Sequence, residues 1–166
     1  MFVAPRVTAP KPCLFLTLRF SICAPVSAGR VLGAQMNRVL LVNDDNEIRD
    51  RNASMLEVLG WEVYVASTEE EVFEFIVACR PAFVVVDIEM TGGAGFESIA
   101  TARGLFSDLF VIAFTRGGNR QLWPEMAKGR GANDYLVGPV SGSKLKEAID
   151  AAVANGLVDT PPEAVK

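Results

Sequence analysis

From position 38 onward, short apolar runs alternate with segments in which apolar residues recur every three or four positions. Most of the runs are rich in Val, Ile or Phe with few polar interruptions, which is typical of strands buried on both faces of a parallel sheet. The segments between them have the spacing of amphipathic helices. The pattern predicts strands over 39–42, 61–66, 83–86, 109–114 and 134–137.

Residues that begin or end helices punctuate the segments between these strands. Gly60 should end the first helix, because glycine accepts the left-handed backbone that commonly closes a helix. Ser67 and Glu70 have the spacing of a capping box for the second, and Pro124 suits the start of a short fourth helix. The expected inward-facing residues are Ile48, Met55, Leu56 and Leu59 in the first helix, Val72, Phe73 and Ile76 in the second, Phe96, Ile99 and Ala100 in the third, and Leu145, Ala148, Ile149, Ala152 and Val153 in the last.

Five strands alternating with five helices predict an α/β fold with a doubly wound parallel sheet. Right-handed crossovers bring the carboxyl ends of the strands to one edge of such a sheet, where open α/β folds place their chemistry. Polar and loop positions that follow the strands should therefore lie together, namely Asn43, Asp44, Asp87, Thr115 and Gly138. Asp87 ends the apolar run over 83–86 and is the centre of the predicted site.

Composition narrows the range of functions. The chain has no His among its 166 residues, which excludes His-dependent triads, His metal sites and a phosphohistidine carrier. The net charge is −4, and residues 1–37 hold four basic residues and no acid, which leaves −8 for the remainder. An acidic body argues against direct contact with nucleic acid. No apolar run approaches the roughly 20 residues of a membrane helix, and three cysteines without metal-type spacing favour a reducing, cytoplasmic setting.

The first 35 residues lack acids and have neither a helical nor a strand period. Three interpretations are open: a secretory signal whose apolar core is interrupted by Arg19, an organelle transit peptide, or an extension that is disordered or results from a start codon assigned too early. We favour the last, because Met36 lies just before the first strand. The expected organisation is an extension over 1–36, one domain over 37–156 and a tail over 157–166.

Four stretches, taken in order, resemble the receiver domain of two-component response regulators: 39–49, 84–90, 111–115 and 131–139. The resemblance covers nearly three quarters of the chain, from Arg38 to about Gly156. Any one stretch is weak, but their order and spacing together are specific. The resemblance implies a flavodoxin-like fold with strand order 2-1-3-4-5 and a role in phosphorelay signal transduction.

The same resemblance implies roles for residues at the sheet edge. Asp87 would accept a phosphoryl group from a histidine kinase or a phosphotransfer protein, and the Thr115 hydroxyl would bond that group and move inward. Mg²⁺ would be held by Asp44, Asp87 and the backbone carbonyl of Glu89. Tyr135 would turn inward as the state changes, and the domain would signal to a separate downstream protein.

Two positions depart from the family pattern. Asn43 replaces the first acid of the metal-binding pair and would be a weak ligand, and Gly138 replaces a lysine. The two losses cancel in net charge, but Mg²⁺ would bind weakly and the phosphoryl group would lack its usual cation. Arg116 is a candidate substitute for that cation, because Arg binds phosphate bidentately; the competing interpretation is a solvated loop Arg that narrows access. Thr91, also atypical, should loosen its loop without touching the chemistry.

Other functions stay open from the sequence alone. The fold could be a degenerate receiver that acts as a phosphorylation-independent protein-binding module. Asp87-Ile88-Glu89-Met90-Thr91 also resembles the nucleophile motif of haloacid-dehalogenase-type phosphatases, although that family carries the motif on its first strand and here two strands precede it. A cobalamin-binding domain would need a histidine. We expect no enzymatic activity beyond phosphorylation and dephosphorylation of Asp87 itself.

Overall fold

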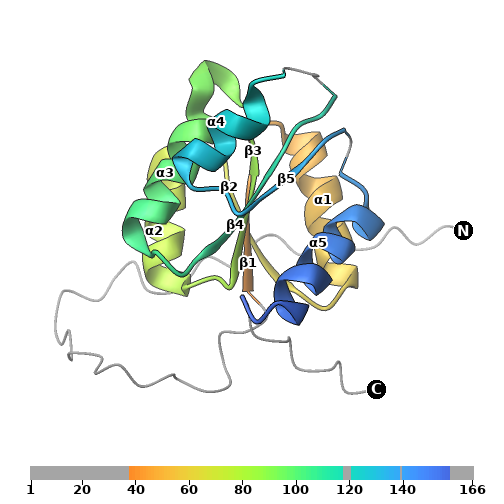
Figure 1. Ribbon diagram of the computed structural model, residues 1–166. Helices are drawn as coiled ribbons and strands as arrows, with labels where there is room; N and C mark the ends of the chain where they lie inside the picture. Colours follow the sequence, from red (N-terminus) through yellow and green to blue (C-terminus); the bar gives the residue numbers. More distant parts are fainter. Residues whose placement is uncertain (1–37, 118–120, 139, 158–166) are drawn as a thin grey trace, which may run out of the picture. The chain divides into compact units, whose positions relative to one another are not determined.

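The computed structural model describes residues 38–117, 121–138 and 140–157. The expected extension over 1–36 and all but the first residue of the expected 157–166 tail lie outside them. Figure 1 shows a central sheet with helices on both sides. The strands are β1 (Arg38–Val42), β2 (Glu62–Ala66), β3 (Phe83–Asp87), β4 (Phe110–Phe114) and β5 (Asp134–Leu136); the helices are α1 (Asn46–Val58), α2 (Glu69–Cys79), α3 (Ala94–Leu105), α4 (Trp123–Arg130) and α5 (Gly142–Ala154), with a 3-10 turn, Thr91–Gly93, before α3.

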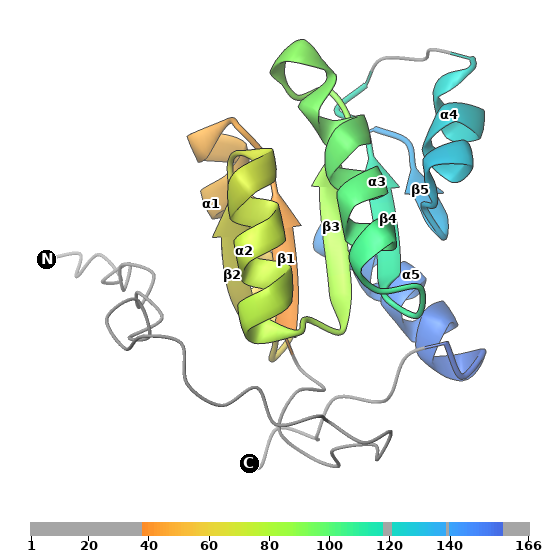
Figure 2. The ribbon, with the colours of Figure 1, turned by 90° about the vertical axis from the view of Figure 1, so that its left-hand side faces the viewer.

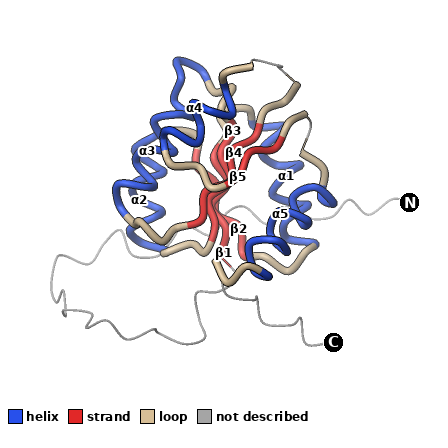
Figure 3. The backbone as a smooth tube through the Cα atoms, viewed as in Figure 1, coloured by secondary structure: helices blue, strands red, loops and turns tan. Residues whose placement is uncertain are grey.

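The sheet is parallel throughout, with strand order β2-β1-β3-β4-β5. This confirms the predicted doubly wound α/β fold and its 2-1-3-4-5 order. Helices α1 and α5 cover one face, and α2, α3 and α4 cover the other (Figure 3). Successive residues of a strand face opposite sides of the sheet, so Leu40 and Val42 join the core under α2, α3 and α4. Val39 and Leu41 join the core under α1 and α5.

Strand β3 is the centre of the sheet and is buried along its whole length. Its first residue, Phe83, packs edge-on against Trp61 and Phe110, with ring centroids 5.1 and 5.6 Å apart. Trp61 lies just before β2 and not within it, so β2 begins one residue later than the pattern indicated, as does β4. These aromatic contacts hold β3 at its amino end and leave its carboxyl end for polar residues.

The start of α2 differs from the predicted capping box. Thr68, not Ser67, is the N-cap, and its hydroxyl accepts a hydrogen bond from the Glu71 N–H at 3.3 Å. Glu71, not Glu70, reaches back and accepts from the Ser67 N–H at 2.6 Å. The expected inward position of Phe73 is also wrong, because its side chain is 49% exposed. The buried residues of α2 are Val72, Ile76 and Cys79.

Polar residues collect at the carboxyl edge of the sheet, where β1, β3 and β4 end side by side (Figure 2). Asp87 pairs with Phe114 in the register of the sheet, so Thr115 stands one residue beyond it. The backbone N–H groups of Asn43 and Thr115 donate to carbonyls at the ends of β2 and β5, at 3.0 and 3.1 Å. These hydrogen bonds fix the backbone from which the side chains of the site project.

Candidate functional site

Asp87 is fully buried at the end of β3. One carboxylate oxygen, Oδ2, accepts a hydrogen bond from the Asn43 side-chain amide at 3.0 Å and lies 3.1 Å from Nε of Arg116. The other oxygen, Oδ1, accepts a hydrogen bond from the Glu89 N–H at 2.8 Å. The carboxylate is thus held by groups from three different loops, those that follow β1, β3 and β4.

Burial raises the pKa of Asp87 above its ordinary value of 3.8. The Glu89 N–H and the Arg116 charge oppose this shift, and the Glu89 and Asp44 carboxylates add to it. Because the folded state binds the proton more tightly than the unfolded state, Asp87 favours folding below pH 3.8, and this contribution is lost as the pH rises through the raised folded-state pKa. At neutral pH the ionised carboxylate therefore costs folding free energy, as is common for residues kept for chemistry.

The buried Asn43 amide has its orientation fixed from both ends. Its oxygen accepts a hydrogen bond from the Asp45 N–H at 2.7 Å, and its NH₂ group donates to Asp87. The reverse orientation would set donor against donor and oxygen against carboxylate. Asn43 therefore presents its NH₂ group to Asp87. Its amide oxygen, the atom that could bind a metal ion, is directed to the Asp45 N–H instead.

Asp44 is tied to the loop that follows β3. Its Oδ2 accepts hydrogen bonds from the N–H and from the hydroxyl of Thr91, both at 2.8 Å. Burial acts to raise the pKa of Asp44, but these two hydrogen bonds, together with one to its own backbone and the charge of Arg116, lower it below its ordinary value. The expectation that Thr91 merely loosens its loop is wrong, because Thr91 fastens the loop to Asp44.

The Glu89 carboxylate organises a second cluster. Its Oε1 accepts hydrogen bonds from the Thr115 hydroxyl and from the Arg116 N–H, the latter at 2.9 Å. A hydroxyl and a main-chain N–H that converge on one anionic oxygen make a small anion-binding site, and Glu89 fills it. Tyr135 borders this cluster: burial raises the pKa of its phenol, the charge of Glu89 adds to the shift, and a hydrogen bond with Thr115 opposes it.

The Arg116 guanidinium lies among three oxygens. Besides its contact with Asp87, Nη1 is 3.4 Å from Oδ2 of Asp45, and Nη2 donates to the backbone carbonyl of Glu89 at 3.2 Å. The Nε–H makes no hydrogen bond, so its contact with Asp87 is an ion pair by distance alone. Asp45, the N-cap of α1, was missed as a site residue; its place beside Asp44 is the one sequence signal that could have found it.

Gly138 adopts a backbone conformation that would be strained for a lysine, because its φ of +86° lies in the left-handed region that favours glycine. The space beside it is taken by Lys144. The Lys144 ammonium stands 3.8 Å from where a Cβ of residue 138 would be, and it donates to the Val137 carbonyl at 3.1 Å. The left-handed backbone at this position therefore favours the glycine over the lysine that the resemblance leads one to expect.

Most of the residues predicted for the sheet edge do meet there. Hydrogen bonds and ion pairs join Asp87 to Asn43, Glu89 and Arg116, and Glu89 in turn to Thr115. Asp44 interacts electrostatically with both Arg116 and Asp87.

The oxygens at this edge fit Mg²⁺ poorly. That ion needs oxygen ligands at about 2.0–2.1 Å in near-octahedral geometry. Two of the expected ligands, Asp87 Oδ2 and the Glu89 carbonyl, face the Arg116 guanidinium, and a dication there would be repelled by roughly several kcal/mol at an effective dielectric near 20. Of the other expected ligands, Asp44 Oδ2 accepts two hydrogen bonds from Thr91, and the Asn43 amide oxygen accepts one from the Asp45 N–H. Across the described ranges, no cluster of three acidic or Cys side chains is arranged to hold a metal ion.

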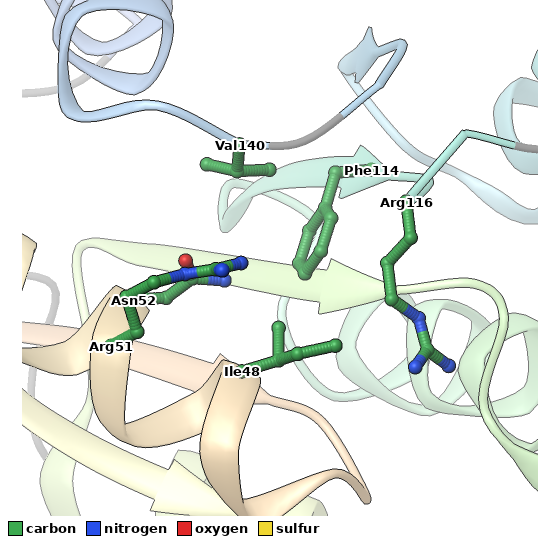
Figure 4. Close-up of a pocket in the computed structure, with 6 residues that line it drawn as sticks. All are labelled: Ile48, Arg51, Asn52, Phe114, Arg116 and Val140. Carbon is green, nitrogen blue, oxygen red and sulfur yellow. The ribbon is translucent and has the colours of Figure 1, made fainter.

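A pocket of about 170 Å³ lies beside Arg116, between α1 and the segment that leads into α5 (Figure 4). Asn52, on α1, is 1% exposed, and neither its amide nitrogen nor its amide oxygen has a hydrogen-bond partner in the described part of the chain. A buried amide left unsatisfied costs about 1–3 kcal/mol. The lining residues are Ile48, Arg51, Asn52, Phe114, Arg116 and Val140.

Replacing Asn52 with Leu should raise the free energy of unfolding by about 1–2 kcal/mol, because it removes an unsatisfied amide and fills apolar space. Urea unfolding followed by circular dichroism measures the change. Asn133→Leu makes the same change at an exposed position and should have the opposite sign, since the Asn133 oxygen accepts a hydrogen bond from the Val111 N–H at 2.8 Å. Equal effects of the two substitutions would contradict the assignment.

Comparisons with known proteins identify one protein family. Residues 39–150 match the family model for the response regulator receiver domain. The transcriptional regulatory protein AfsQ1 of Streptomyces coelicolor is 30% identical over 73% of this chain and 53% of its own length. The response regulator MprA of Mycobacterium leprae is 29% identical over 77% of this chain and 56% of its own length, so the chain spans about half the length of these relatives.

Solved structures agree with the family match. A response regulator receiver domain protein from Methanospirillum hungatei superposes with a TM-score of 0.65 at 26% identity, over 73% of this chain and 96% of its own. One from Clostridium thermocellum gives 0.64, also at 26% identity, over 72% and 95%. Among the described residues, no helix has the length and apolar character needed to cross a membrane.

Proposed function

This chain belongs to the response regulator receiver domain family of two-component signalling, and from that premise we propose that it accepts a phosphoryl group on Asp87 and passes the change to a separate protein. The observation that carries the proposal is the pairing of a buried carboxylate with an anion-binding site. Asp87 ends β3, and the Thr115 hydroxyl and the Arg116 N–H converge nearby on an anionic oxygen.

The transfer follows from the arrangement of the two Asp87 oxygens. Oδ2 has two side-chain contacts, with Asn43 and Arg116, whereas Oδ1 accepts one hydrogen bond, from the Glu89 N–H; Oδ1 is therefore the oxygen that attacks the donor. A bond forms between Oδ1 and phosphorus, the bond from phosphorus to the donor breaks, and the donor leaves with that electron pair. The phosphoryl oxygens then replace Glu89 as the acceptor of the Thr115 hydroxyl.

Receiver domains are phosphorylated by histidine kinases, and we propose such a kinase or a phosphotransfer protein as the donor.

Thr115 links the site to Tyr135 on β5, so release of Thr115 by Glu89 changes the surroundings of that ring. At the start of α4, within it and just after β5, the apolar side chains of Leu122, Met126 and Val137 are between 46 and 65% exposed. We propose that the downstream protein partner binds to this surface. We also propose that the protein is located in the cytoplasm.

A phosphorylation-independent binding module is the second candidate function. It is favoured by one observation: Asp87 is fully buried and Arg116 lies against it.

Receiver domains are generally not enzymes, and we propose no activity beyond gain and loss of the phosphoryl group at Asp87. The phosphatase alternative has less support, because the motif that suggested it, residues 87–91, lies within the segment that matches the receiver domain model.

Mass spectrometry of the full chain after incubation with acetyl phosphate tests the proposal. We expect the wild type to gain the mass of one phosphate and Asp87→Asn to gain none. Asp108→Asn makes the same change at an exposed position and should be labelled like the wild type. A wild type that stays unlabelled by acetyl phosphate and by a phosphorylated histidine kinase would refute phosphorylation and support the binding module.

A further inference from the structure

We propose that the Arg116 guanidinium takes the place of a divalent cation at this site, so that the site works without bound metal. Receiver domains typically bind Mg²⁺ at the phosphorylation site, and the oxygens of this chain fit that ion poorly. The proposal rests on the proposed function only in taking Asp87 as the phosphoryl acceptor. The exclusion of metal by Arg116 rests on geometry.

The guanidinium stands where the expected metal ligands converge. It lies 3.1 Å from Asp87 Oδ2 and 3.2 Å from the backbone carbonyl of Glu89. The family resemblance assigns the Asp87 carboxylate and that carbonyl to Mg²⁺. Its third contact is with the Asp45 carboxylate. Asp45, Asp87 and Glu89 come from two separate loops, and the cation that bridges them comes from a third, after β4.

The chemistry of Arg suits this position. A guanidinium is planar, stays charged at all relevant pH values and offers five N–H groups in a fixed fork, so it meets several oxygens at once. A lysine ammonium carries the same charge but has no such fork. The spread of contacts from Nε, Nη1 and Nη2 over three oxygens uses this shape.

The neutral Asn at position 43 suits a cation with one positive charge better than a cation with two. An Asp at position 43 would add one negative charge, and a dication would add one positive charge more than a guanidinium does. Asn43 and Arg116 make both changes together, and these two offset each other; the lysine missing at Gly138 still leaves the site one positive charge short of the family pattern with bound Mg²⁺. The Asn43 NH₂ group also donates to the same Asp87 oxygen that Arg116 contacts, which leaves that oxygen engaged without a metal.

In the transfer step the guanidinium supplies the positive charge next to the accepting carboxylate. An anionic donor approaches Asp87 against the charges of Asp44 and Glu89, and Arg116 offsets them. The Arg116 side chain is one-third exposed, so it has access to the transferred group as well as to Asp87. Its N–H groups donate to phosphoryl oxygens in the same way that they now face carboxylate oxygens.

Direct titration with Mn²⁺, followed by electron paramagnetic resonance of the free ion, tests the exclusion of metal without any phosphorylation. We expect the wild type to show no saturable binding in the millimolar range. Arg116→Ala should bind Mn²⁺ at least about tenfold more tightly, because a cation next to the ligands is removed. Asn43→Asp combined with Arg116→Ala should bind more tightly still, and adding Asp87→Asn should abolish the gain.

Arg130→Ala is the matched control, because Arg130 is also ion-paired, at 2.6 Å from Glu97, but on α4 and away from the site. It should leave Mn²⁺ binding unchanged. Saturable binding by the wild type that Asp87→Asn removes would overturn the proposal. So would an Arg116→Ala variant that binds no better than the wild type while the double variant with Asn43→Asp does bind, since position 43 alone would then exclude the ion.

Labelling of Asp87 by acetyl phosphate, with excess chelator or with millimolar Mg²⁺, tests the functional side. The wild type should be labelled at rates within about twofold of each other in the two conditions, whereas Arg116→Ala should be stimulated by Mg²⁺ at least about fivefold. Strong stimulation of the wild type by Mg²⁺ would overturn the proposal. Absence of labelling in every condition would refute the proposed function instead, and the Mn²⁺ titration would still decide on the role of Arg116.

Discussion

Gly95→Ala is expected to lower the free energy of unfolding by about 3 kcal/mol or more, at the upper end of what overpacking costs. Gly95 is the second residue of α3, and a Cβ added there would stand 2.3 Å from the carbonyl oxygen of Asp87 and 2.7 Å from Cα of Ile88. Both neighbours are backbone atoms, so no side chain rotation relieves the clash. Urea unfolding followed by circular dichroism measures the loss.

Gly104→Ala provides the matched control within the same helix. Nothing lies within 4 Å of a Cβ added at Gly104, so Ala there should stabilise the protein by about 0.5–1 kcal/mol through its better helix propensity. The two substitutions should therefore act in opposite directions. If Gly95→Ala proved as stable as the wild type, α3 would not pack against the residues around Asp87 as closely as described.

The clash at Gly95 also has a consequence for the site. Relief requires the backbone at Asp87 and Ile88 to move, and the neighbouring Glu89 N–H is the group that bonds Asp87 Oδ1. Any Gly95→Ala protein that stays folded should therefore also lose labelling at Asp87. The close approach of α3 is thus one of the features that set the position of the accepting carboxylate.

The strands could be predicted because burial on both faces leaves a continuous apolar run. Their alternation with helices predicted a doubly wound parallel sheet, whereas the strand order came from the family resemblance. The cap of α2 could not be placed in the same way. Ser67 and Thr68 are both suitable N-caps, and Glu70 and Glu71 are both acids, so the sequence offers two capping boxes one residue apart. The backbone conformation after β2 selects the second, and spacing alone does not specify it.

The meeting of Asp87 with residues from distant loops was predictable from topology, but the individual contacts were not. The orientation of the Asn43 amide depends on a backbone N–H two residues later. The direction of Arg116 depends on Asp45, whose position is set by its role as the N-cap of α1. Such hydrogen bonds cross between loops, and neither hydrophobic period nor motif spacing carries information about them.

Glu89→Gln is expected to accelerate the labelling of Asp87 by acetyl phosphate by about tenfold. In the present structure the Glu89 carboxylate accepts the hydrogen bonds from Thr115 and from the Arg116 N–H, and an incoming phosphoryl group needs those donors. Glutamine keeps the shape but removes the charge, so it competes less for the donors and no longer repels an anion. A change of about 1.4 kcal/mol in the barrier corresponds to this factor, which is within the range of one nearby charge at an effective dielectric near 20.

Initial rates of mass increase, measured by mass spectrometry, check this expectation. Glu57→Gln is the matched control, because it makes the same change at an exposed position of α1 and should leave the rate unchanged. The expected order is wild type equal to Glu57→Gln, with Glu89→Gln faster than both. A slower Glu89→Gln protein would mean that the carboxylate assists the transfer, and Glu89 would then have to be assigned a direct part in the chemistry and not the role of a competitor for Thr115.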